Sequence, residues 1–159
     1  MISTLSIKEF KERLAETTKE GNLGIRNSPF AIFSIFGESN KNFYGNFNNT
    51  SFQLTKNNIL RFGMSYTISG TIRSINANET EVSYGFKKMN KLTKIWFIIF
   101  PIFTIIMLNT FLVIQSKKIE IFLLLNTFII IGGLFYYLMS KFNKKELEKS
   151  FRRVFEIID

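Results

Sequence analysis

The sequence predicts an α+β membrane protein. An N-terminal helix and a small antiparallel β half-barrel or barrel precede a transmembrane α-helical hairpin and a C-terminal amphipathic helix. Three observations lead to this fold class. Residues 95–114 and 121–139 are uncharged apolar runs, each long enough to cross a membrane. Residues 41–86 alternate between apolar and polar side chains, as strands with one buried face do. Apolar residues recur at helical spacing at both ends of the chain.

The two apolar runs are the strongest signal in the chain. Each is close to the roughly 20 residues that a helix needs to cross a hydrocarbon core about 30 Å thick. Residues 115–120 between them are polar and allow only a tight reversal. A pair of buried helices in a soluble protein is the alternative, but two tandem uncharged runs favour a membrane. We therefore predict a hairpin domain over residues 91–140.

The chain lacks the side chains that most enzymes use. It has no cysteine and no histidine, and its only aspartate is the last residue, Asp159. These absences exclude Ser-His-Asp and Cys-His catalytic sites and the common zinc and iron sites. Glu79 and Glu81 are close together, but their position at a solvated turn does not indicate catalysis. We expect a protein that is not an enzyme and that has no catalytic residue, no metal site and no cofactor.

The formal net charge of +9 is concentrated at the open end of the predicted hairpin. The cations there are Lys87, Lys88, Lys91 and Lys94 before the first run, and Lys141, Lys144, Lys145, Lys149, Arg152 and Arg153 after the second. The positive-inside rule then places both termini in the cytoplasm, although Lys117 and Lys118 lie in the short outer loop. The first residues resemble no signal peptide, so we predict a multi-pass protein of the inner (cytoplasmic) membrane.

The expected partner of these cations is anionic lipid, because lysines next to a span meet the negative surface of the membrane. No basic helix or aromatic and basic platform indicates binding to nucleic acid.

A first helix is predicted over residues 7–20. Ser6 and Glu9 fit a capping box, in which each side chain accepts a hydrogen bond from the backbone N–H of the other residue. Its apolar stripe consists of Ile7, Phe10 and Leu14, and Gly21 is a stop signal. We expect this stripe to pack on the sheet that follows, in preference to a membrane surface or a partner helix.

Six short strands are predicted next, at residues 30–36, 41–47, 50–56, 59–62, 65–75 and 80–86. Short turns rich in Asn and Gly join them into an antiparallel meander. We expect the meander to curl into a half-barrel or small barrel, with the first helix closing one mouth. Gly45 and Gly70 indicate bends or close backbone approach within strands. Residues 1–90 are thus predicted to be one cytosolic helix plus β-rich domain that folds without the hairpin.

Spaced glycines and core apolar residues run through these strands and lead into the hairpin. They are Phe43-x-Gly45, Phe52-x-Leu54, Ile68-x-Gly70-x-Ile72 and Thr80-x-Val82. In this pattern the chain resembles a group of uncharacterised bacterial membrane proteins that pair a cytosolic β-rich domain with two C-terminal spans. The likeness covers about residues 40–140. It implies an architecture and no activity.

The hairpin carries a repeated motif, since Leu108-Asn109-Thr110-Phe111 recurs as Leu125-Asn126-Thr127-Phe128. Asn109 and Asn126 each lie six residues from the loop, so they fall at one depth when the helices fold together. An amide in hydrocarbon needs a partner. The two amides are therefore expected either to bond within one hairpin or to bond to a neighbouring protomer. Gly132 and Gly133 offer a flat surface for close helix packing.

Aromatic and basic residues mark the predicted boundaries of the spans. Trp96, Tyr136 and Tyr137 are typical of an aromatic belt at the cytoplasmic boundary. The lysines expected at the same interface are Lys91, Lys94, Lys141, Lys144 and Lys145.

Residues 141–159 are predicted to form a separate basic amphipathic helix. Its apolar positions are Leu147, Phe151, Val154, Phe155 and Ile158. This helix is expected either to lie in the membrane interface or to dock on the β-rich domain. The periodicity does not decide between these two placements.

The sequence leads to three hypotheses of function. The first is a membrane-anchored cytosolic β-domain that binds a peptide, a lipid head group or a small ligand. Its inward aromatic residues form either a solid core or the lining of a ligand cavity, and they are Phe43, Phe47, Phe52, Tyr66, Tyr84 and Phe86. The second is a structural or regulatory subunit of a larger membrane complex or a homo-oligomer. The third is a membrane-perturbing effector.

Overall fold

The computed structural model describes residues 1–23, 40–57, 66–87, 91–115 and 119–158, and of residues 91–94, 96–98 and 100 it describes the backbone alone. The chain divides into two compact units. The sheet unit consists of Met1–Lys87 and Ser140–Asp159, and the apolar unit consists of Lys88–Met139. Helix α3 (Lys91–Ile114) lies in the apolar unit, and helix α4 (Ile119–Val154) has its N-terminal part there and its C-terminal part in the sheet unit.

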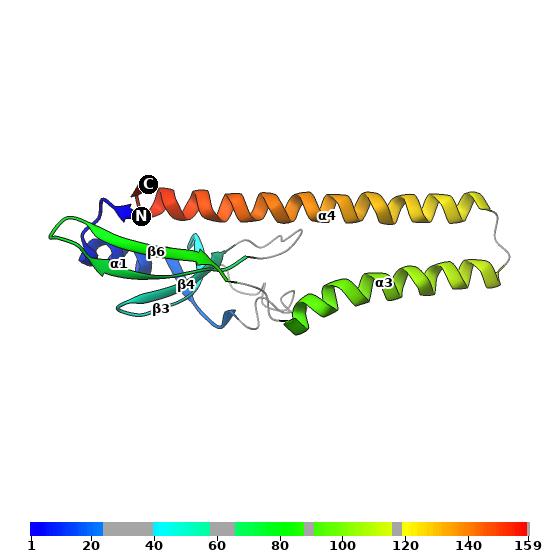
Figure 1. Ribbon diagram of the computed structural model, residues 1–159, viewed down its shortest axis with the longest axis horizontal. Helices are drawn as coiled ribbons and strands as arrows, with labels where there is room; N and C mark the ends of the chain where they lie inside the picture. The colour runs from blue at the N-terminus through cyan, green and yellow to red at the C-terminus, as the bar shows by residue number, and fades with distance from the viewer. Residues whose placement is uncertain (24–39, 58–65, 88–90, 116–118, 159) are drawn as a thin grey trace. The chain divides into compact units, whose positions relative to one another are not determined.

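Over the described residues, a seven-stranded mixed sheet forms the framework of the sheet unit (Figure 1). Its strands are β1 (Ile2–Ser3), β2 (Thr18–Glu20), β3 (Phe43–Phe47), β4 (Ser51–Lys56), β5 (Ile68–Ser74), β6 (Thr80–Phe86) and β7 (Ile157–Ile158). They are arranged in the order β2-β3-β4-β5-β6-β1-β7. Strands β3 to β6 pair in sequence as an antiparallel meander, which confirms four of the six predicted strands. The other two predicted strands, at residues 30–36 and 59–62, lie outside the described residues.

The sheet differs in two ways from the predicted antiparallel half-barrel or barrel. Strand β2 runs parallel to β3, so the sheet is mixed. The described strands end at β2 on one side and at β7 on the other, so over these residues the sheet is open. The reason is the path of α1 (Ile7–Thr17), which leads from β1, near one side, to β2 at the opposite side. A helix on that path covers a face of the sheet and cannot close a barrel mouth.

Helix α1 begins as the sequence predicts. The backbone N–H of Glu9 donates to the Ser6 hydroxyl, and the backbone N–H of Ser6 donates to the Glu9 carboxylate, so the capping box is confirmed. The helix ends at Thr17, three residues before the predicted end at residue 20. It ends early because the following residues pair with β3, where Thr18 lies opposite Phe43.

One face of the meander carries the buried side chains. Cross-strand neighbours such as Leu54 and Ile68 lie on this face and are fully buried. Phe10 and Leu14 from α1 are also fully buried and belong to the same core. Gly70 contributes by its small size, because a Cβ there would come within 2.7 Å of the Phe52 ring. The expected close approach at Gly70 is therefore confirmed.

The C-terminal part of α4 completes this core. Leu147, Phe151 and Phe155 are almost fully buried among the residues of the meander and α1. The Phe155 ring stacks on Phe10 with centroids 4.6 Å apart, and the Phe151 ring lies 5.2 Å from that of Phe52. The sequence left two placements open for the tail, in the membrane interface or on the β-rich domain. In the structure the tail docks on the sheet. Residues 141–159 therefore belong to the same unit as residues 1–87, whereas the sequence predicted a separate segment and a domain that ends near residue 90.

The two ends of the chain pair in one sheet. Strand β1 lies between β6 and β7, with Ile2 opposite Ile158 and Ser3 opposite Ile157. The Ser3 hydroxyl donates to the backbone carbonyl of Phe155 at 2.6 Å. Neither two-residue strand was predicted, because two residues are too few to display an alternating pattern.

Glu156 forms the turn between α4 and β7. Its φ of 50° is in the left-handed region, which a glutamate adopts only at a cost. Arg13 offsets this cost, since its guanidinium donates to the Glu156 carboxylate at 2.7 Å and to the backbone carbonyl of Val154 at 2.9 Å. The Thr4 hydroxyl donates to the other carboxylate oxygen at 2.9 Å. Three segments of the chain thus meet at this carboxylate.

The buried tail leads to a first prediction. Replacing Phe151 with Ala should lower the free energy of unfolding of the sheet unit by about 3–5 kcal/mol, because it leaves a cavity in the core. The measurement is denaturant unfolding of the full chain in detergent, monitored by the circular dichroism signal of the sheet. Phe142→Ala is the matched control, because Phe142 lies on the same helix but is 58% exposed. Equal effects of the two changes would mean that the tail does not contribute to the core.

A second prediction concerns pH. The hydrogen bonds from Arg13 and from Thr4 hold the pKa of the Glu156 carboxyl below its ordinary value. A group with a lowered folded-state pKa stabilises the fold above its unfolded pKa, and this contribution is lost as the pH falls through the folded-state value. We therefore expect the midpoint temperature of thermal unfolding to decrease when the pH is lowered below roughly 4. Glu156→Gln should show a smaller drop than the wild type, whereas Glu16→Gln, an exposed change on α1, should show the same drop.

Candidate functional site

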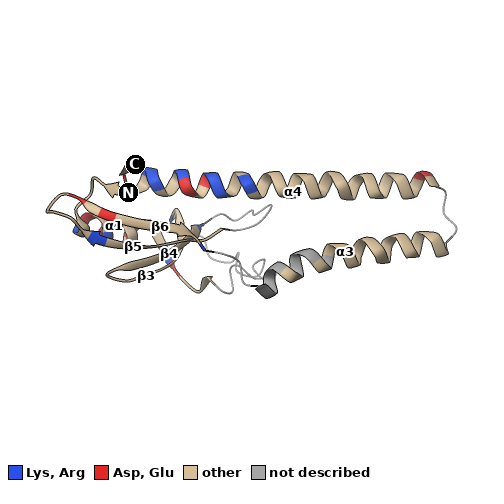
Figure 2. Ribbon diagram, viewed as in Figure 1, with Lys and Arg blue, Asp and Glu red and all other residues tan. Residues whose placement is uncertain are grey.

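The apolar unit presents hydrophobic side chains to its surroundings. Helix α4 is long and apolar enough to cross a membrane, and none of its most apolar stretch is buried. Figure 2 shows a long part of α4 without charged residues, followed by a C-terminal part rich in Lys, Arg and Glu. In α3 the apolar stretch with described side chains is Pro101–Ile114, which is shorter than a span. The described residues therefore establish one long apolar helix.

Asn109 and Asn126 bond to each other within one chain. The Asn109 amide N–H donates to Oδ1 of Asn126 at 3.2 Å, and the Asn126 amide N–H donates to Oδ1 of Asn109 at 2.9 Å. Each amide nitrogen also donates to a carbonyl four residues earlier in its own helix, Ile105 at 2.9 Å and Phe122 at 2.8 Å. Every amide N–H of the pair thus has an acceptor inside an apolar unit. This is the intrachain arrangement of the two that the sequence left open.

Gly132 and Gly133 are exposed, and a Cβ at either position would meet no atom within 4 Å. They therefore do not pack against α3 in the described residues. Their surface is open for close contact with another helix or with lipid.

The residues predicted at the membrane interface lie on both helices. The side chains of Lys91, Lys94 and Trp96 fall outside the described residues. Tyr137 is exposed and Tyr136 is half-buried, and both lie in the apolar unit. Lys141, Lys144 and Lys145 are exposed and lie in the sheet unit. The Lys144 ammonium lies 4.5 Å from the centre of the Phe86 ring, so one of these cations also holds α4 to the sheet.

The six aromatic residues proposed as a core or a cavity lining pack against one another and the tail. Phe43 and Phe52 are fully buried, and the other four, Phe47, Tyr66, Tyr84 and Phe86, are partly buried around them. The Tyr84 ring lies 5.0 Å from Phe151, and its hydroxyl donates to the Glu148 carboxylate at 3.4 Å. Rings from the tail thus occupy the space next to this face of the sheet, which favours a core.

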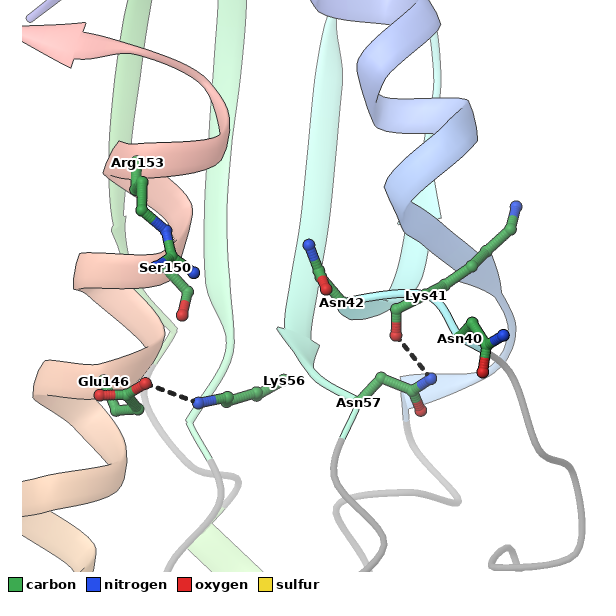
Figure 3. A pocket seen from close by; sticks show the side chains of 8 residues that line it. All are labelled: Asn40, Lys41, Asn42, Lys56, Asn57, Glu146, Ser150 and Arg153. Carbon is green, nitrogen blue, oxygen red and sulfur yellow. Dashed lines mark hydrogen bonds and ion pairs between the residues drawn. The ribbon is translucent and has the colours of Figure 1, made fainter.

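A polar cleft of about 320 Å³ lies elsewhere in the sheet unit (Figure 3). Its lining consists of Asn40, Lys41, Asn42, Lys56, Asn57, Glu146, Ser150 and Arg153. Glu146, Ser150 and Arg153 come from α4 at positions i, i+4 and i+7, which share one helix face. Asn40, Lys41 and Asn42 directly precede β3, and Lys56 and Asn57 lie at the end of β4, the neighbour of β3 in the sheet. None of the described residues that line this cleft is aromatic.

An ion pair crosses the cleft. The Lys56 ammonium donates to the Glu146 carboxylate at 2.9 Å, and this hydrogen bond holds the pKa of Glu146 below its ordinary value. The positive charges of Lys149 and Arg153 act in the same direction. The Lys41 ammonium is not part of this ion pair. It donates to the backbone carbonyls of Ala15 and Thr18 at the end of α1. Figure 3 accordingly shows the Lys41 side chain pointing away from Glu146 and Lys56.

The sequence did not predict this cleft. Its residues come from three segments that alternation and helical spacing treat separately. A partial signal was present in the i, i+4, i+7 spacing of Glu146, Ser150 and Arg153, since Ser150 places a small polar side chain between two charged ones. That spacing predicts one wall of a cleft only once the apolar face of the same helix is known to dock on the sheet.

Comparison with known proteins adds no relative. The chain matches no protein-family profile, no curated protein and no solved structure.

The paired amides lead to a third prediction. Asn109→Leu should lower the free energy of unfolding of the apolar unit by about 0.5–2 kcal/mol, because it leaves Asn126 without its side-chain partner among apolar residues. The double change of Asn109 and Asn126 to Leu should recover much of this loss, because no unpaired amide is left. The measurement is denaturation of the full chain in detergent.

Thr127→Val is the matched control for this cycle. The Thr127 hydroxyl donates only to Leu123 of its own helix, so its removal should cost less than the loss of one Asn. Additive effects of the two Asn changes would show that the amides do not stabilise each other.

Proposed function

We propose that this protein is a non-enzymatic, membrane-anchored binding module. A two-span helical hairpin tethers the sheet unit to the cytoplasmic face of the inner membrane, and the sheet unit binds a small ligand in its polar cleft. The observation that carries the proposal is the exposed apolar surface of α4. Phe128 is 74% exposed and Ile130 is 71% exposed, on a stretch of helix without a charged residue.

Lipid explains this surface better than water does. A soluble protein rarely exposes so large a continuous apolar patch, because contact with water is unfavourable for each of these side chains. A helix satisfies its backbone hydrogen bonds internally, as a segment in hydrocarbon must. The paired Asn109 and Asn126 meet the same requirement for side chains, since each amide finds its acceptors within the unit.

The chain ends support an even number of spans. Strands β1 and β7 pair directly, so the first and last segments belong to one folded unit. A single crossing would put these segments on opposite sides of the membrane and prevent that pairing. Two crossings, by α3 and by the N-terminal part of α4, keep them on the same side.

The lysines support the cytoplasmic side for the sheet unit. Lys141, Lys144 and Lys145 are exposed directly after the apolar stretch of α4, where the positive-inside rule expects cations on the cytoplasmic side. Anionic lipid is the proposed partner of these residues.

A second candidate function is that of a subunit in a larger membrane complex or a homo-oligomer. The open space at Gly132 and Gly133 favours it, because glycines let another helix approach closely in a membrane. Replacing both with Leu would block such contact, and a change in the oligomeric state in detergent would support this candidate.

A fourth prediction tests the proposed topology. The chain has no cysteine, so each single substitution introduces one unique thiol. In intact bacterial spheroplasts a membrane-impermeant maleimide should label Gln115→Cys, next to the short loop. It should label Lys8→Cys and Lys149→Cys only after the membrane is permeabilised, because both positions belong to the sheet unit.

Labelling of all three thiols at equal rates in intact spheroplasts would contradict the proposal. Recovery of the protein in the soluble fraction after lysis would contradict it as well. Labelling of Lys8→Cys and Lys149→Cys alone would keep the anchor and invert its orientation.

A further inference from the structure

The cleft contains two side chains that could bind a ligand and that make no hydrogen bond or ion pair with a described residue. Ser150 is only 9% exposed and lines the cleft, yet its hydroxyl makes no hydrogen bond to any described residue. Arg153, three residues further along α4, is exposed and forms no ion pair or hydrogen bond within the described ranges. Figure 3 shows the Arg153 side chain running along α4 toward Ser150. The Ser150 hydroxyl is thus available to a ligand in the cleft, and the Arg153 guanidinium beside it brings a positive charge.

The opposite wall supplies a cation that is already paired. The Lys56 ammonium reaches across to Glu146 at 2.9 Å, and both side chains are about one-third exposed. Water therefore reaches this ion pair, and an exposed pair contributes little to stability. A stronger anion can replace the Glu146 carboxylate at Lys56 at a small cost to the fold.

We propose that the cleft binds a phosphate group, with Arg153, Ser150 and Lys56 as its donors and Glu146 as an internal carboxylate that the phosphate displaces from Lys56. This inference rests on the proposed binding function and names its ligand class. The Arg153 guanidinium offers a planar pair of N–H donors that fits two phosphate oxygens, and Lys56 adds a point charge. The Asn42 amide, which Figure 3 shows on the sheet side of the cleft, is a further donor.

Phosphate fits these donors better than a carboxylate does. The donors come from two walls, with Arg153 and Ser150 on α4 and Lys56 and Asn42 on the sheet. The oxygens of a phosphate point in tetrahedral directions and can accept from both walls at once, whereas the two oxygens of a carboxylate lie in one plane. A metal ion or an organic cation is disfavoured, because among the described lining residues Glu146 is the only carboxylate and it already faces Lys56.

The volume of about 320 Å³ exceeds that of one phosphate group, so the cleft also holds part of the molecule that carries it. That molecule is either a soluble phosphorylated compound or a phospholipid head group. The two sources share the same recognition chemistry, and an experiment can separate them.

The test uses the full chain in a phosphate-free detergent, dodecyl maltoside, titrated with inorganic phosphate at constant ionic strength. We expect Arg153→Gln to raise the dissociation constant at least about tenfold, because it removes a charge-assisted pair of hydrogen bonds. Glu146→Gln should lower the dissociation constant, because it removes the competing carboxylate. Lys149→Gln is the matched control, since it removes the same charge from the same helix at an exposed position outside the cleft.

A second arm addresses the lipid source. Micelles that contain phosphatidylglycerol are compared with micelles that contain the same fraction of diacylglycerol, which lacks the phosphate. If the ligand is a head group, phosphatidylglycerol should raise the thermal midpoint in the wild type and not in Arg153→Gln. Binding of inorganic phosphate that depends on Arg153 would instead indicate a soluble ligand. Either result supports the phosphate site.

Three results would overturn it. The first is the absence of any response to either probe that depends on Arg153, in a variant whose circular dichroism matches that of the wild type. The second is an equal effect of Lys149→Gln and Arg153→Gln, which would indicate general charge attraction. The third is weaker binding by Glu146→Gln, which would make this carboxylate part of the ligand's site. Thiol labelling tests the membrane anchor separately, so loss of the phosphate site leaves the anchor intact.

Discussion

The structure depends on the packing of Phe151 and Phe155 against rings from the rest of the sheet unit. Phe155 lies 4.6 Å from Phe10 and 6.0 Å from Phe43, and Phe151 lies 5.2 Å from Phe52, as measured between ring centroids. Burial of each such ring stabilises the fold by about 1.5–3 kcal/mol. These contacts bring the last 20 residues of the chain onto a sheet whose other strands end before residue 87. The core is therefore complete only after the chain has passed through the apolar unit and returned.

This return restricts how the protein meets a membrane. The tail that fills the core also supplies β7, which pairs with β1 at the opposite end of the sequence. Both ends then share one side of any membrane that the chain crosses, and the proposed hairpin meets this condition with two spans. In this proposal the sheet unit is a domain tethered by the hairpin. Its core is assembled from residues that precede the hairpin in the sequence and from residues that follow it.

Polar side chains divide into those that the fold satisfies and those that it does not. Asn109 and Asn126 satisfy each other where no water is expected, and Arg13 binds the Glu156 carboxylate that closes the turn into β7. At the cleft the balance differs, because Arg153 is exposed and forms no ion pair or hydrogen bond within the described residues. Ser150 lines the same cleft and makes no hydrogen bond to a described residue, and this is why the cleft is the better candidate for binding than the packed aromatic core.

By itself the sequence determined the features that depend on neighbouring residues. Alternation predicted β3 to β6 and their buried face, Ser6 and Glu9 predicted the start of α1, and the uncharged runs predicted the apolar helices, because each pattern repeats within a few residues. The equal distance of Asn109 and Asn126 from the loop showed that they could meet. Only the tertiary structure decided the parallel β2, the strands β1 and β7, the docking of the tail and the cleft. These features join segments up to about 150 residues apart, and strands of two or three residues carry no period of their own.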